Sequence, residues 1–186
     1  REHSNSLRFL RDAFDELDED FLVDLQNVSN AILVDNQARA TITDDDNRPN
    51  LSIDSVTTTE GANSSFTVTL DAPSNLTVSV SFATANGSAF ANQDYTANSG
   101  ALTFQAGETS KSVLVLGLQD NSNEADESFT IALSNENNAG VTMRTGTGTI
   151  NNDDLVAISI NDVTGNEGNA GTTNFTFTVT LSNPSA

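Results

Sequence analysis

The sequence predicts an all-β protein built from tandem immunoglobulin-like antiparallel β-sandwiches. Short runs alternate apolar with Thr or Ser residues, and Gly and Pro separate these runs. Alternation with a period of two is typical of strands that bury one face. Segments of the chain also recur at a spacing of 108 residues. A period near 100 residues is too long for a solenoid and suits a sandwich domain.

The recurrence divides the chain into three parts. Residues 12–21 match 120–129, and residues 41–46 match 149–154, both at a displacement of 108, while 51–56 match 158–163 at 107. We therefore expect residues 1–46 to be the C-terminal half of a repeat, 47–154 a complete repeat, and 155–186 the N-terminal part of a further one. A half repeat is too small to bury a normal core alone, so we expect the sequence to be a window of a longer array.

The complete repeat is expected to hold about seven strands, the number in a simple immunoglobulin-like sandwich. Phe66, Val68 and Leu70 should point into the core, because polar residues alternate with them. The apolar run 113–118 is expected to form a central strand, and residues 141–150 to form the closing strand.

The two partial repeats show the same alternation. Strands are expected over 6–10, 21–25 and 38–43 in the first part. In the last part, six apolar residues are expected to face inward: Ile158, Ile160, Phe175, Phe177, Val179 and Leu181.

Charge excludes several kinds of partner. The chain has 26 acidic and seven basic residues and a formal net charge of −19. This charge repels nucleic acid and anionic membrane surfaces and attracts cations. There is no cysteine, hence no disulfide framework or thiolate metal site. No apolar run approaches the roughly 18 residues of a membrane-spanning helix, so direct membrane insertion is not expected.

Acidic residues recur at the ends of the expected strands. In the complete repeat they are Glu60, Asp94, the group Asp120, Glu124, Asp126 and Glu127, and the pair Asp153 and Asp154. The corresponding loops can meet at one end of a seven-strand sandwich. Carboxylates gathered there would repel one another unless a hard cation lay among them, and Ca²⁺ accepts six to eight oxygen ligands.

The order of these motifs resembles the Calx-beta domain. The motifs are Val56 with Glu60-Gly61, Asp94-Tyr95, Gly107-Glu108, the stretch from Asp120 to Phe129, and Gly148-Thr149-Ile150 followed by Asp153-Asp154. The likeness extends over essentially the whole chain, because the later motifs occur twice. It implies a calcium-binding sandwich whose ions lie at the end that faces the next domain.

The resemblance also implies a ligand set for Ca²⁺. Its members are Glu60, Asp94, Asp120, Glu124, Asp153 and Asp154. Two stretches depart from the family pattern of acidic runs, because Asn121, Ser122 and Asn123 follow Asp120, and Asn152 precedes Asp153. Fewer charges imply fewer or weaker ions, nearer the millimolar affinities of extracellular modules. Asp126 and Glu127 can instead serve only to cap the next strand.

Catalysis is not expected. His3 is the only histidine, so the complete repeat has no histidine base, and no cysteine nucleophile exists. Paired carboxylates could act on sugars, but the tryptophan platforms usual in sugar clefts are absent.

The leading interpretation is a structural or adhesive, calcium-stiffened segment of a large extracellular or surface protein, secreted and bacterial. Its partners are neighbouring like repeats. Other copies of the chain, joined through the incomplete ends into a filament, are an alternative to a cut window. Two other functions remain open: a calcium-sensing regulatory module, which should bind near micromolar calcium, and a ligand-binding head.

Overall fold

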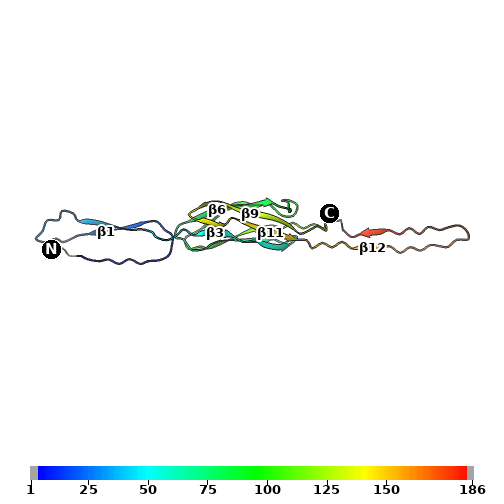
Figure 1. Cartoon of the computed structure of the whole chain (residues 1–186), viewed down its shortest axis with the longest axis horizontal. Helices are drawn as coiled ribbons and strands as arrows, with labels where there is room; N and C mark the ends of the chain where they lie inside the picture. Colours follow the sequence, from blue (N-terminus) through cyan, green and yellow to red (C-terminus); the bar gives the residue numbers. More distant parts are fainter. Residues whose placement is uncertain (1–3, 184–186) are drawn as a thin grey trace.

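The computed structural model describes residues 4–183 and contains only β-strands as regular secondary structure within them. Figure 1 shows three segments arranged end to end. The N-terminal segment pairs β1 (Glu19–Asp24) with β2 (Gln37–Ile42), and the C-terminal segment pairs β12 (Ile158–Ile160) with β13 (Val179–Leu181). A two-layer sandwich lies between them. The predicted all-β sandwich class is confirmed.

The sandwich consists of a four-stranded and a five-stranded sheet. The first has the order β10-β3-β5-β8 and the second β4-β11-β9-β6-β7. The strands are β3 (Asn50–Ile53), β4 (Val56–Thr59), β5 (Ser64–Leu70), β6 (Val78–Asn86), β7 (Ser99–Phe104), β8 (Ser110–Val115), β9 (Glu127–Asn137), β10 (Gly140–Met143) and β11 (Thr145–Asn151).

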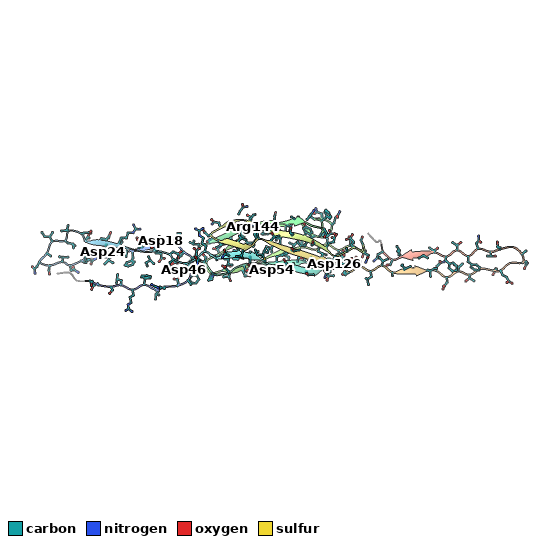
Figure 2. The ribbon with its side chains drawn as sticks, in the orientation of Figure 1. Asp18, Asp24, Asp46, Asp54, Asp126 and Arg144 are labelled. Atoms are coloured by element: carbon teal, nitrogen blue, oxygen red, sulfur yellow. The ribbon has the colours of Figure 1, made fainter. Side chains whose placement is uncertain are left out.

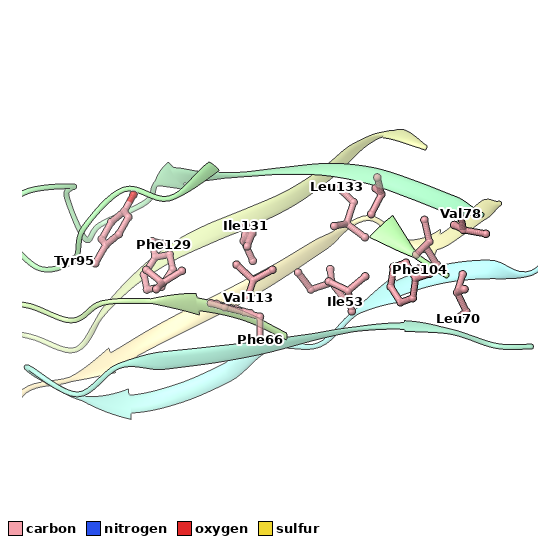
Figure 3. Packing of buried hydrophobic residues seen from close by; sticks show 14 of the residues in the cluster. Ile53, Phe66, Leu70, Val78, Tyr95, Phe104, Val113, Phe129, Ile131 and Leu133 are labelled. Atoms are coloured by element: carbon pink, nitrogen blue, oxygen red, sulfur yellow. The ribbon is translucent and has the colours of Figure 1, made fainter. Parts of the chain in front are cut away.

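The core lies between the two sheets and follows the predicted alternation. Phe66 and Val68 of β5 face Phe129 and Ile131 of β9, and each of the four is at most 1% exposed. Figure 3 shows the cluster running the length of the sandwich, from Tyr95 at one end to Val78 and Phe104 at the other. The ring of Phe129 meets Phe66 edge-on, with centroids 5.8 Å apart.

The sandwich has nine strands rather than about seven, because the first and last expected strands each divide between the two sheets. β3 pairs with β5, whereas β4 pairs with β11 in the other sheet. The crossing falls at Asp54-Ser55, where the Ser55 hydroxyl accepts a hydrogen bond from Thr147 N at 2.9 Å. The β10–β3 and β11–β4 pairs are parallel, so the sandwich is not purely antiparallel.

The expectation of a central strand over 113–118 was wrong. β8 lies at the edge of the four-stranded sheet and pairs only with β5. Val113 and Val115 point into the core, while Leu114 and Leu116 are 49% and 47% exposed. An unbroken apolar run does not reveal whether both faces of a strand are covered.

The end segments depart most from expectation. Residues 6–10 form no strand. All six apolar residues expected to face inward in the C-terminal segment are between 49% and 73% exposed. In the described part of the chain, β12 and β13 form a sheet of their own with no second sheet against it. The division into repeats 1–46, 47–154 and 155–186 stays a prediction.

None of the described residues forms a helix long and apolar enough to cross a membrane.

We predict that Phe129→Ala will destabilise the chain by about 3 to 5 kcal/mol, because it removes a buried ring that contacts both Phe66 and Tyr95. Urea unfolding measures this change. The control is Phe90→Ala, which removes a ring that is 51% exposed and should cost much less. Equal losses for the two variants would contradict this account of the core.

Candidate metal centre

The strand topology brings the acidic loops to one end of the sandwich. β4 and β11 run parallel, so Glu60 and Asp154, which follow them, emerge on the same side. The loop over residues 116–126, which joins β8 to β9 and contains Asp120 and Glu124, lies at this end. Figure 2 places Asp126 at the end of the sandwich nearest the C-terminal segment.

A first group contains Glu60, Asp120 and Asp154. One carboxylate oxygen from each lies within 4.8 Å of the others. Asp120 N donates to Glu60 Oε1 at 2.9 Å, which ties the two loops together. Asp154 Oδ2 is buried and has no hydrogen-bond partner. A buried carboxylate oxygen without a partner is costly, so this oxygen points to an absent ligand.

A second group contains Asp94, Glu124 and Glu127, again with oxygens within 4.8 Å of one another. Asp94 Oδ2 accepts a hydrogen bond from Phe90 N at 2.6 Å. The next residue, Tyr95, is 1% exposed and stacks on Phe129 with ring centroids 4.3 Å apart. Tyr95 thus anchors the loop and holds Asp94 at the edge of the core.

Five of the six predicted ligands come together in these two groups. Asp153 does not join either one; it is exposed and accepts a hydrogen bond from Gln119 Nε2 at 3.2 Å. Glu127 joins the second group, although the sequence left it as a strand cap. The signal was present: Glu127 lies two residues before buried Phe129 on β9, and alternation gives both side chains the same face.

Crowding of like charges perturbs these carboxyls. Burial, a hydrogen bond with Asp94, and the charges of Asp94 and Glu124 raise the pKa of Glu127 to about 7. Burial also raises the pKa of Glu60, and the charges of Asp120 and Asp154 add to this rise. Burial, with Asp120 and Asp94, raises the pKa of Glu124. The sandwich end therefore favours positive charge, whether from protons or from a cation.

The donor set fits Ca²⁺. Both groups offer only carboxylate oxygens, the ligands that hard divalent cations prefer. Oxygens on opposite sides of one Ca²⁺ ion lie about 4.6 to 5.2 Å apart, so a spread of 4.8 Å suits ligands of a single ion. The unpartnered oxygen of Asp154 supplies the independent sign that the first group takes a ligand.

The N-terminal segment has a comparable acidic surface. Asp12, Glu16 and the run Asp44 to Asp46 line a cavity of about 340 Å³. Partial burial and the charges of Asp45 and Asp44 raise the pKa of Asp46. Among residues 4–183, only the two groups of the sandwich bring three carboxylates within 4.8 Å.

We predict that the metal-free chain loses stability as pH rises from about 4.5 to about 7. In this window the unfolded chain releases the Glu127 proton while the folded chain keeps it. Glu127→Gln should reduce the loss by about 1 kcal/mol, a value discounted for partial exposure. Chemical denaturation in chelator at several pH values measures this. An unchanged pH slope in Glu127→Gln would contradict the assignment.

Comparison with known proteins identifies the family and the fold of the chain. The Calx-beta domain family model matches residues 2–46 and 53–154. No curated protein matches the chain. Among solved structures, the apo-form Calx CBD1 domain is 23% identical with a TM-score of 0.53, covering 58% of this chain and 100% of that one. The calcium binding domain CBD12 of CALX1.1 is also 23% identical with a TM-score of 0.53, covering 59% and 49%. The Calx CBD2 domain is 18% identical with a TM-score of 0.52, covering 57% and 91%.

These structures show a shared fold, and the family match extends over most of the sequence. The chain therefore belongs to the Calx-beta family and is a calcium-binding β-sandwich module.

Proposed function

We propose that the chain is a structural segment of a large surface or secreted protein, in which calcium fixes the angle between the sandwich and the repeat that follows it. The observation that carries this proposal is the buried, unpartnered oxygen of Asp154. Asp154 belongs to the first carboxylate group and also lies in the connection to the C-terminal segment, residues 152–157. An ion held there acts on the joint itself.

Hydrogen bonds support this coupling. The side-chain amides of Asn123 and Asn152 both donate to the main-chain oxygen of Asp154, the latter at 3.0 Å. An ion bound by Glu60, Asp120 and Asp154 would neutralise repulsion between the loops and hold the first residues of the connection. Without it, the charges favour a looser joint.

The proposed ligands are Glu60, Asp120 and Asp154 for one ion and Asp94, Glu124 and Glu127 for another. Asp153 is proposed only as an outer carboxylate near the first ion. Because Asn121, Asn123 and Asn152 replace acids of the family pattern, we expect weak binding, matched to the millimolar calcium found outside cells. This favours an extracellular or surface location.

Neighbouring like repeats are the proposed partners. Large apolar side chains of the end segments are exposed, among them Leu22 at 53% and Phe177 at 55%. Further strands of the same kind would cover them. Alternatively, other copies of the chain could cover these side chains by joining end to end into a filament. Sedimentation at increasing concentration distinguishes the two, because only the filament requires growing mass.

We predict that Asp154→Asn lowers calcium affinity at least about tenfold, equal to about 1.4 kcal/mol, because it removes a buried charged ligand. Isothermal titration calorimetry measures this. Asp162→Asn is the control, since it removes one exposed charge outside both groups. The same affinity in both variants would overturn the assignment. Wild-type binding near micromolar would favour the calcium-sensing alternative.

Calcium should also change the shape of the molecule in solution. Small-angle scattering is expected to show a more rigid, more extended particle in calcium than in chelator, because the ion offsets repulsion beside the linker. Magnesium serves as the control, since it requires a smaller, octahedral site. Identical scattering curves with calcium and chelator would exclude stiffening and leave only calcium binding.

A further inference from the structure

The N-terminal segment contacts the sandwich at a second place besides the linker. Asp15 forms an isolated parallel bridge with Ser74, in the turn between β5 and β6. Asn75 N donates to the main-chain oxygen of Asp15 at 3.1 Å. Asn75 Nδ2 donates to Glu16 Oε2 at 3.0 Å. The contact therefore uses both main-chain and side-chain atoms.

The contact is buried. Asp15 is 5% exposed and Ser74 is 2% exposed. The Ser74 hydroxyl donates toward Asp15, 3.1 Å from its main-chain oxygen and 3.3 Å from Oδ2. Leu76 N donates to the same hydroxyl at 3.0 Å, and Gly107 N donates to the Ser74 carbonyl at 2.9 Å. Hydrogen bonds within the sandwich thus hold Ser74 in place while its hydroxyl binds Asp15 of the N-terminal segment. The turn is therefore preorganised for this contact.

The linker supplies the other attachment. Pro49 is buried, and its carbonyl accepts a hydrogen bond from Gly140 N at 2.9 Å. On the other side, Asp44 N donates to Asp18 Oδ1 at 3.0 Å. One attachment alone allows rotation about the linker. Two attachments, at Pro49 and at Ser74, restrict that rotation.

We propose that the Ser74-Asn75 turn is a docking site for the Asp15-Glu16 segment, and that this contact fixes the angle between the N-terminal segment and the sandwich without a metal ion. Its hydrogen bonds join protein donors to protein acceptors. In contrast to Asp154 Oδ2, no buried side-chain oxygen of Asp15 is left without a hydrogen-bond partner, so this contact carries no sign of a missing ion among the described residues. This inference is independent of the calcium-dependent joint proposed above.

The corresponding position in the sandwich is built differently. A displacement of 108 residues places Asn123 where the N-terminal segment has Asp15. Asn123 donates to the main-chain oxygen of Asp154, within the connection that follows its own sandwich. The repeated sequence is thus used in two ways: Asp15 reaches the next sandwich, while Asn123 holds the linker.

The test uses the full chain, which has no cysteine to interfere with labelling. Thr41→Cys on β2 and Thr103→Cys on β7 place spin labels at two exposed strand positions on either side of the joint. In excess chelator, pulsed dipolar spectroscopy should give a narrow distance distribution. Adding Ser74→Ala should broaden it. Ser55→Ala should not, although it also removes a hydroxyl that accepts a main-chain hydrogen bond.

A broad distribution in chelator that narrows only with calcium would overturn the proposal, as would equal distributions with and without Ser74→Ala. A second variant, Asp15→Cys with Ser74→Cys, checks proximity even if Ser74→Ala unfolds. Bridged residues lie close enough for a disulfide, so rapid crosslinking in chelator is expected and its absence would contradict the contact. Calcium titration of Ser74→Ala should give the same affinity as the wild type, because Ser74 lies outside both carboxylate groups. The docking contact and the calcium site can therefore fail their tests independently.

Discussion

The structure depends on one constraint: strand pairing delivers like charges to a single end of the sandwich. Because β4 and β11 run parallel, the residues after them emerge together. The β8 to β9 loop opens on the same side, and Asp94 comes from a loop anchored there by Tyr95. Five of the six carboxylates in the two groups are partly buried, and burial together with neighbouring acids raises the pKa of Glu127, Glu124 and Glu60. A cation relieves the same repulsion that a proton does.

The hydrophobic core provides the rigidity that this constraint requires. Phe129 stacks on Tyr95 and meets Phe66, and Glu127 precedes Phe129 by two residues on the same strand. Protein interiors are close-packed and leave side chains little room to shift. The positions of Asp94 and Glu127 are therefore set by the packing of the neighbouring Tyr95 and Phe129. The metal centre is therefore an extension of the core, and its ligands are held near one another before any ion binds.

Much of this could be predicted from the sequence, and the rest fails for identifiable reasons. Period-two alternation predicted the buried face of β5, and the recurring acidic motifs predicted five members of the two carboxylate groups. Sheet switching at Asp54-Ser55 could not be predicted, because the pattern of a strand does not say which neighbour it pairs with. Asp153 and Asp154 are adjacent acids, and only the course of the chain after β11 decides which one turns inward. Glu127 was missed because the cap interpretation ignored its register with Phe129.

The two ends of the sandwich connect to the neighbouring segments through different interactions: hydrogen bonds at one end and charged carboxylates at the other. At the Ser74 end, neutral donors and a buried carboxylate form short-range hydrogen bonds, which depend on geometry and little on ionic strength. At the Asp154 end, uncompensated carboxylates dominate, so the joint responds to cations and to pH. In an array, a hydrogen-bonded joint would keep its angle at any calcium concentration, whereas the angle at an ion-dependent joint would be fixed only when calcium is bound. At positions 108 residues apart, Asp15 contacts the turn of the following sandwich and Asn123 contacts the main chain of Asp154, so the same place in the repeated sequence serves a different joint each time.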